Sequence, residues 1–123
     1  MSNQVFPKQK RLVKGDHFTR VMRRGQCAAD GCLVVFALPN ERNDVATHCR
    51  LGVTVPKKTG NAVVRNRWKR WIRESFRTQQ TKLPGGMDFV VRPKKGAVGS
   101  WKAIEKSLPK LAKKATERLR QSK

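Results

Sequence analysis

The hydrophobic and polar positions along the chain repeat with two different periods, and these periods predict its helices and strands. Residues 8–24 begin with basic side chains and then place apolar ones at the spacing of an amphipathic helix. A helical spacing also runs from Asn61, a good N-cap, to about residue 79 without Gly or Pro. Residues 100–120 show helical spacing again, with Pro109 inside the segment. Because proline removes a backbone donor and clashes with the preceding turn, we expect it to kink this last helix or divide it in two.

Three shorter segments have the composition of β-strands. Residues 33–38 (LVVFAL) are β-branched and aromatic, and they end before a proline. Residues 50–55 (RLGVTV) alternate apolar with other side chains and also end before a proline. Since the second segment follows the first closely, we expect these two strands to pair antiparallel. Residues 87–92 (MDFVVR) follow a Pro-Gly-Gly turn and form the third predicted strand.

The order of these elements predicts the fold class. Helix, strand, strand, helix, strand and helix follow one another, which is typical of an α+β fold with helices packed on a small, mostly antiparallel sheet. A chain of 123 residues falls in the usual size range of one domain, so we expect residues 1–123 to form a single domain. We expect residues 1–10 and 120–123 to be flexible, because chain ends fray unless other contacts hold them.

The composition adds a very high positive charge. The chain carries 29 Lys and Arg against 8 Asp and Glu, a net charge of +21, which far exceeds what solubility requires and implies a polyanionic partner. The apolar runs are too short to span a bilayer and the N-terminus lacks the apolar segment of a secretory signal. We therefore expect a cytoplasmic protein with no membrane partner. The three cysteines and His48 lack the paired short spacings of a zinc site, so we expect no metal bound by the protein alone.

The predicted helix that starts at Asn61 concentrates this charge. Its apolar positions recur every four residues and predict a stripe that faces the sheet: Val64, Trp68, Ile72 and Phe76. Basic positions recur at the same interval on a neighbouring face, about 6 Å apart along the axis, which is close to the distance between neighbouring phosphates. Like charges at this interval destabilise a helix, and acids are almost absent here. We therefore interpret the face as a surface for a polyanion rather than as an ordinary solvated face.

The same segment, TGNAVVRNRWKRWIRESFR, closely resembles the signature of the bacterial ribonuclease P protein subunit. KRLVKGDHFTRVMRRG is similar to the first helix of that family, LGVTVPKKTGNA to its strand and lead-in, and MDFVVRPKKG to its last strand. The resemblance implies a subunit that binds a catalytic RNA and the 5′ leader of precursor tRNA and promotes endonucleolytic removal of the leader. We expect no obligate protein partner. It also implies a left-handed βαβ crossover, against the usual right hand.

The resemblance further implies two sets of binding residues. The basic helix is expected to contact the catalytic RNA through Arg65, Asn66, Arg67, Lys69, Arg70 and Arg73. A cleft between the first helix and the sheet is expected to bind the single-stranded leader by base stacking and charge. The residues matched to this cleft are Phe18, Phe36, Lys14, Lys57 and Lys58. For the two phenylalanines, core packing is an equally good interpretation, because buried Phe is common.

The sequence shows no set of side chains typical of a protein catalyst, such as paired carboxylates or a Ser/His/Asp triad. The resemblance implies that the RNA subunit performs the hydrolysis with Mg²⁺ ions that it mainly holds itself, so we expect no catalytic residue in the protein. Two other functions are considered, a ribosomal or other structural RNA-binding protein and a stand-alone nuclease. The basic motif and its flanking matches favour ribonuclease P over the first, and the missing acid/base set disfavours the second.

Overall fold

The computed structural model describes residues 15–39 and 49–121. Along the chain these residues form α1 (Gly15–Arg24), β1 (Gln26–Ala29), β2 (Leu33–Pro39), β3 (Arg50–Val53), η4 (Lys57–Thr59), α2 (Ala62–Thr78), η5 (Gln80–Lys82), β4 (Met87–Pro93) and α3 (Trp101–Gln121). The predicted helices and strands are all present, and β1 is an additional strand. The ends expected to be flexible lie mostly outside the described residues, although Arg120 and Gln121 belong to α3.

The strands form one mixed sheet in the order β1-β2-β4-β3. The pairs β1–β2 and β2–β4 are antiparallel, and β3–β4 is parallel, so the sheet is mostly antiparallel as expected. The predicted antiparallel pairing of residues 33–38 with 50–55 is wrong, because β4 lies between these two strands. Since β4 is buried at every position except Arg92, it occupies the centre of the sheet and pairs on both sides. β3 and β4 are joined through α2, so the expected crossover is present and its left hand stays a prediction.

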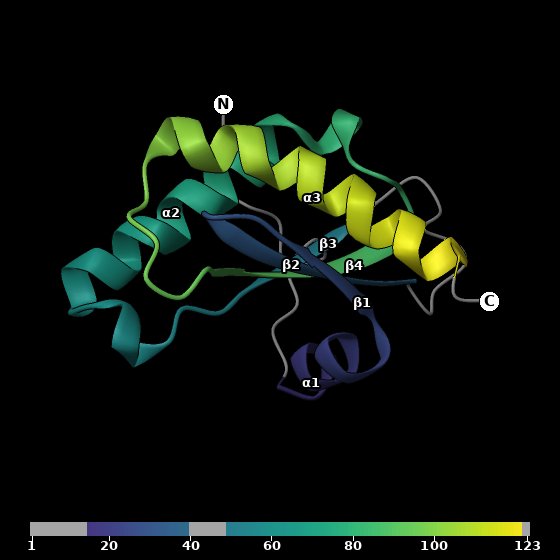
Figure 1. The fold of residues 1–123 in the computed structure, drawn as a ribbon, viewed down its shortest axis with the longest axis horizontal. Coiled ribbons are helices and arrows are strands. Elements are labelled where there is room, and N and C mark those ends of the chain that lie inside the picture. Colours follow the sequence, from purple (N-terminus) through teal and green to yellow (C-terminus); the bar gives the residue numbers. More distant parts are fainter. Residues whose placement is uncertain (1–14, 40–48, 122–123) are drawn as a thin grey trace, which may run out of the picture.

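Alternation along the strands gives the sheet two faces that are covered by different helices. Leu33, Val35 and Ala37 of β2 belong to the larger core, which α2 and α3 complete. Leu38 and Val90 belong to a smaller cluster that α1 completes. Figure 1 shows α1 on one side of the sheet and α2 and α3 on the other. The protein therefore has two separate sides, one that carries α1 and one that carries α2 and α3.

Gly25 permits the close turn from α1 into the sheet edge. A Cβ atom at this position would lie 2.3 Å from the carbonyl oxygen of Ala37 and 2.5 Å from that of Val21. No side chain fits between these backbone atoms. β1 then continues with the sequence QCAA, of which only Ala28 is buried. Small residues with no β-branching give no strand signal, which explains why this edge strand was not predicted.

α3 is a single helix that contains Pro109. Proline has no N–H, so Pro109 cannot donate to the carbonyl oxygen of Glu105, its helical acceptor one turn earlier. Gln79, the residue at the C-cap of α2, donates from Nε2 to this oxygen at 3.0 Å and is itself only 6% exposed. The same Nε2 donates to Ser75 Oγ at 2.7 Å. Gln79 at the end of α2 thus donates to the carbonyl oxygen in the middle of α3 that has no helical donor because of Pro109.

α2 is fixed at its N-terminus and along its inner side. Asn61 Oδ1 accepts a hydrogen bond from the Val64 backbone N–H at 3.0 Å, which confirms the predicted N-cap. The inner side buries Trp68, Ile72, Ser75 and Phe76. Gly99, in the loop after β4, lies so close to the Trp68 ring that a Cβ there would be 2.5 Å from Cζ2. The sheet, α3 and this loop together hold α2 in one orientation.

Candidate nucleic-acid interface

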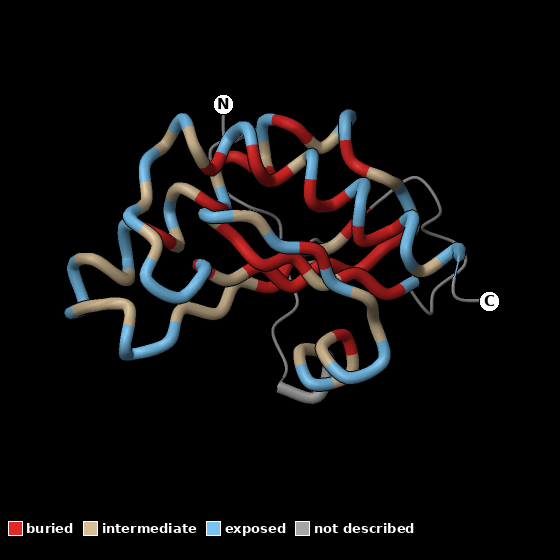
Figure 2. Tube along the Cα trace, viewed as in Figure 1, coloured by how far each residue is buried: buried red, intermediate tan, exposed pale blue. Residues whose placement is uncertain are grey.

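The residues predicted to contact a catalytic RNA divide into two groups on α2. Arg65 and Lys69 are half-buried, whereas the other four are exposed: Asn66, Arg67, Arg70 and Arg73. At 3.6 residues per turn, Asn66, Arg70 and Arg73 lie within about 60° of one another around the axis. They lie opposite the buried stripe of Trp68, Ile72, Ser75 and Phe76. We call the four exposed residues, Asn66, Arg67, Arg70 and Arg73, the outer side of α2. Figure 2 shows exposed turns along this helix.

Two of the arginines on α2 are positioned by contacts within the chain. Arg65 Nε donates to the carbonyl oxygen of Gly60 at 3.2 Å. The Arg67 guanidinium carbon lies 5.9 Å from the centroid of the Trp71 ring, and that ring meets Trp68 edge-on with 6.3 Å between centroids. Because a guanidinium has five N–H donors, each arginine keeps donors available for a partner. These contacts reduce the conformational freedom that binding would otherwise remove.

Glu74 is the one acidic residue of α2, and Arg77 neutralises it. Arg77 donates from Nε to Glu74 Oε1 at 3.2 Å and from Nη2 to Glu74 Oε2. The hydrogen bond from Arg77 lowers the pKa of Glu74, so the carboxylate stays ionised and paired. The charge of the outer side of α2 is therefore not offset by an acid of the same helix.

The sheet face that carries α1 holds the predicted leader-binding phenylalanines. Phe18 on α1 and Phe36 on β2 are both half-buried and pack against the cluster of Val21, Leu38 and Val90. The core-packing interpretation therefore applies to both rings. The Arg92 guanidinium carbon lies 5.4 Å from the centroid of the Phe36 ring. A cation thus sits over an aromatic side chain on this face, which is the combination expected for single-stranded nucleic acid.

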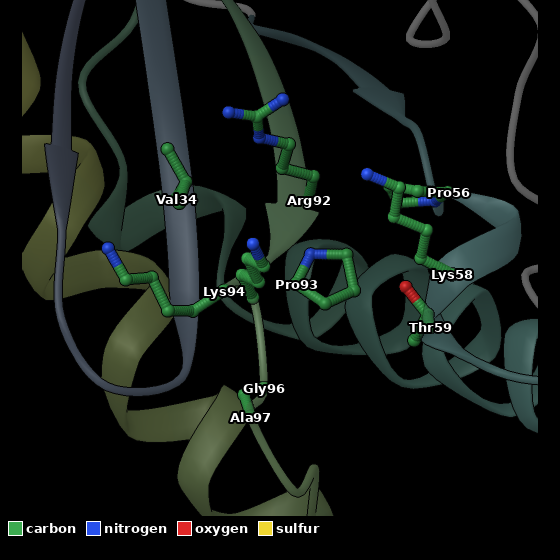
Figure 3. A pocket seen from close by; sticks show the side chains of 10 residues that line it. Val34, Pro56, Lys58, Thr59, Arg92, Pro93, Lys94, Gly96 and Ala97 are labelled. Carbon is green, nitrogen blue, oxygen red and sulfur yellow. The ribbon is translucent and has the colours of Figure 1, made fainter.

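A pocket of about 750 Å³ opens beside Arg92. It lies between the segment that leads into α2 and the loop that follows β4 (Figure 3). Its walls are formed by Val34, Pro56, Lys58, Thr59, Arg92, Pro93, Lys94, Lys95, Gly96 and Ala97. Figure 3 shows the Lys58 and Lys94 side chains on opposite sides of the pocket. Among the residues that the structure describes, the lining contains four basic side chains and no acidic one, so the pocket is suited to an anion.

The pocket brings together residues that sequence reasoning found and residues that it missed. Lys58 lines the pocket, and Lys57 is exposed on η4 next to it. Lys14 lies outside the described residues. Arg92, Lys94 and Lys95 were not predicted as binding residues. Arg92 faces Val34 across the β2–β4 pair and shares its face with Phe36. The alternation in MDFVVR could have placed Arg92 on this face, but only with the strand pairing known.

On the sheet, Arg50 and Asp88 form an ion pair within the protein. Arg50 on β3 donates from Nε to Asp88 Oδ1 at 2.9 Å and from Nη2 to Asp88 Oδ2 at 2.8 Å, and the Asp88 side chain is 1% exposed.

Among residues 15–39 and 49–121, no three His, Cys, Asp or Glu side chains gather where they could hold a metal ion. In the same residues, no helix is both long enough and apolar enough to cross a bilayer.

These features define a class of protein. α2 is held in one orientation and has a basic outer side. The basic pocket lies next to Phe36, whose ring has the Arg92 guanidinium over it. Both features are typical of a small α+β protein that binds nucleic acid. The net charge of +21 agrees with that class.

Comparison with known proteins identifies the family. The family model described as Ribonuclease P matches residues 6–116. The ribonuclease P protein component of Petrotoga mobilis is 39% identical over 107 residues, which cover 87% of this chain and 87% of the relative. That of Bacillus mycoides is 40% identical over 102 residues, which cover 82% of this chain and 86% of the relative.

Solved structures agree in fold as well as in sequence. A Staphylococcus aureus RNase P protein, a mutant with defective mRNA degradation activity, matches with a TM-score of 0.77 and 34% identity over 89% of this chain and 90% of its own. The RNase P protein from Thermotoga maritima matches with a TM-score of 0.70 and 33% identity over 84% of this chain and 96% of its own. The chain belongs to the ribonuclease P protein family. The family assigns it a role, together with an RNA subunit, in processing the 5′ leader of tRNA.

Proposed function

We propose that this chain is the protein subunit of a ribonuclease P whose RNA subunit is the catalyst, and that two surfaces of the protein bind two different RNAs. The outer side of α2, with Arg65 and Lys69 beside it, binds the catalytic RNA. The sheet face beneath α1 and the pocket beside Arg92 bind the single-stranded 5′ leader of precursor tRNA. The observation that carries the proposal is the Arg92–Phe36 contact at the edge of a pocket with four basic side chains.

The outer side of α2 suits a folded RNA because its charges are fixed in place. The buried side of the helix and the bond from Gln79 to α3 hold its orientation, so the exposed arginines keep a constant spacing. Arginine can bond a phosphate through two parallel N–H groups, and Asn66 can donate to a phosphate or to a base edge. Glu74, the one acid of this helix, is already paired with Arg77, which lies outside the exposed group.

The opposite side of the sheet suits a flexible strand. A single strand has unstacked bases, which gain from aromatic side chains, and a backbone that follows a positive groove. Phe18 and Phe36 are each partly exposed, Lys58 lines the pocket, and Lys57 is the exposed residue before it on η4. A volume of about 750 Å³ is in the range of sites that hold a drug-sized ligand, and it therefore has room for one nucleotide.

The hydrolysis is assigned to the RNA subunit, with Mg²⁺ ions held mainly by that RNA. The protein contributes binding energy, and its charge of +21 reduces the repulsion between the catalytic RNA and the substrate. We place the complex in the cytoplasm, with no obligate protein partner. The isolated protein should leave a leader-bearing precursor intact in the presence of Mg²⁺. Cleavage at the rate of the assembled complex, without the RNA subunit, would contradict this assignment.

Two double variants that lose the same charge test the two surfaces separately. Arg67→Gln with Arg70→Gln changes α2, and Lys58→Gln with Arg92→Gln changes the pocket. The α2 variant should bind the catalytic RNA at least tenfold more weakly, with a salt slope reduced by about 2 because each phosphate contact contributes about 0.9. It should keep the ratio of precursor affinity to mature tRNA affinity once the complex is assembled at saturating protein.

The pocket variant should behave in the opposite way. Its affinity for the catalytic RNA should stay within about twofold of the unchanged protein, since each lost contact concerns the leader alone. Its complex should lose affinity for the leader-bearing precursor and not for mature tRNA. If both variants weaken the same step to the same extent, the assignment of two RNAs to two surfaces is wrong.

A further inference from the structure

The side of α3 that faces away from the sheet is strongly basic. The buried side of this helix carries Ile104, Leu108, Leu111 and Ala115, which belong to the main core. Opposite them lie five exposed basic residues, which we call the outer face of α3: Lys102, Lys106, Lys110, Lys113 and Arg120. One exposed acid, Glu117, lies on the same side between the last two of them. Figure 2 shows the turns of α3 exposed on this side and buried toward the sheet. At 1.5 Å per residue the row is about 27 Å long.

Internal ion pairs explain little of this row. Lys110 Nζ lies 3.3 Å from Asp30 Oδ2, and the Lys110 side chain is still 58% exposed. Within the described part of the chain it is the one residue of the outer face with an ion pair. Lys102, Lys106 and Lys110 follow one another at intervals of four residues, where like charges destabilise a helix. A bound polyanion would neutralise all of them together.

The kind of side chain indicates which polyanion fits. Lysine presents a point charge on a flexible stem, which contacts phosphates without the paired geometry that reads bases or fixes one phosphate. The outer face of α3 contains no aromatic residue, and binding of a single strand depends on aromatic stacking. A straight row of basic side chains about 27 Å long, in which four of the five are lysines, instead suits the phosphate backbone of a duplex, which proteins recognise by shape rather than by sequence.

The location of the row separates it from the leader. α1 and the aromatic face lie on one side of the sheet, and α3 lies on the other (Figure 1). A leader bound beneath α1 therefore does not cover the outer face of α3. We propose that this face is a further RNA-binding surface, which takes the phosphate backbone of an RNA duplex without sequence preference. This goes beyond the two surfaces assigned above and does not depend on them.

Two triple variants with equal loss of charge test the proposal. The first changes Lys102, Lys106 and Lys113 to Gln. The control changes Arg24, Lys82 and Lys114 to Gln, which are all exposed and lie outside both proposed interfaces and outside the outer face of α3. The assay measures binding of the isolated protein to a 20-base-pair RNA duplex of arbitrary sequence over a range of salt concentrations. Because no catalytic RNA or leader is present, the result is independent of the proposed function.

The outer-face variant should bind the duplex at least tenfold more weakly than the control. Its salt slope should fall by about 2 to 3, because each lost phosphate contact lowers the slope by about 0.9. Equal losses in the two variants would show a general charge effect and overturn the proposal. A difference that appears with phosphatidylglycerol vesicles and not with the duplex would overturn it in favour of a membrane surface.

Discussion

The bond between α2 and α3 depends on a carbonyl group that Pro109 leaves without its helical donor. Gln79 Nε2 donates to the Glu105 oxygen at 3.0 Å, and Gln79 is 6% exposed. Gln79→Leu keeps a similar volume and removes the donor. An unpaired buried acceptor costs about 1–3 kcal/mol, and because this bond is only partly buried we expect the free energy of unfolding to fall by about 1.5 kcal/mol.

A second substitution makes this prediction specific. In Pro109→Ala, residue 109 regains an N–H that can donate to the Glu105 oxygen within α3. Gln79→Leu should then cost about 0.5 kcal/mol, which reflects the remaining bond from Gln79 to Ser75 Oγ at 2.7 Å. The difference is a coupling energy of about 1 kcal/mol, within the range found for residues that share one hydrogen bond.

Urea unfolding of the four proteins in this double-mutant cycle measures the coupling. The midpoint should shift and the slope with denaturant should stay constant, because neither substitution changes the surface exposed on unfolding. Equal costs of Gln79→Leu in the two backgrounds would refute the idea that Gln79 replaces the donor that proline removes.

Two further stability measurements test local features of the fold. Partial burial raises the pKa of Asp30, but hydrogen bonds from Ser107, from the Leu33 and Cys32 backbone N–H groups and from Lys110 outweigh it and lower the pKa from 3.8 to about 2. Because the folded pKa lies below the unfolded one, this stabilisation is present above about pH 4 and is lost as the pH falls toward 2. Asp30→Asn should therefore flatten the pH dependence of the melting temperature between about pH 4 and 2. A profile as steep as that of the unchanged protein would count against this reasoning. Gly25→Ala should lower the free energy of unfolding by about 3 kcal/mol, because the new Cβ would meet backbone oxygen atoms at 2.3 and 2.5 Å. Gly31→Ala, whose Cβ would meet nothing within 4 Å, is the control and should change it by less than about 0.5 kcal/mol, so similar losses in both glycine variants would contradict the packing argument.

The elements of the fold could be predicted where local chemistry decides them. The N-cap at Asn61 and the apolar stripe of α2 are local features, and the structure confirms the cap and three of the four stripe residues as buried. The fourth, Val64, is half-buried at the margin of the core. The strand composition of β2 and β4 was equally clear.

Strand pairing could not be predicted, because it depends on contacts between distant segments. Closeness in sequence suggested that residues 33–38 and 50–55 pair, yet β4 separates them. The continuous apolar run in β4 was the available signal, since a strand buried on both faces belongs in the centre of a sheet. β1 gave no signal because Cys27, Ala28 and Ala29 are small and only Ala28 is buried.

In the candidate site too, local features could be predicted and contacts between distant segments could not. The basic residues of α2 follow from periodicity within one helix, and the structure places three of the predicted ones, Arg67, Arg70 and Arg73, on its exposed outer side. Arg92 and Lys94 line the pocket because the strand register sets Arg92 opposite Val34, and this register could not be predicted from the sequence. For Phe18 and Phe36 the structure shows packing and partial exposure together. Their contact with the leader stays a prediction.

Crosslinking in the assembled complex tests the central claim most directly. A photo-crosslinking amino acid replaces either Arg70, on the outer side of α2, or Lys95, at the pocket. The complex contains the catalytic RNA and a precursor tRNA with an intact 5′ leader, and the crosslinked nucleotides are then mapped by sequencing. We predict that position 70 crosslinks to the catalytic RNA and position 95 to leader nucleotides. Crosslinks from position 70 to the leader, or from both positions to the catalytic RNA alone, would contradict the assignment of the two surfaces.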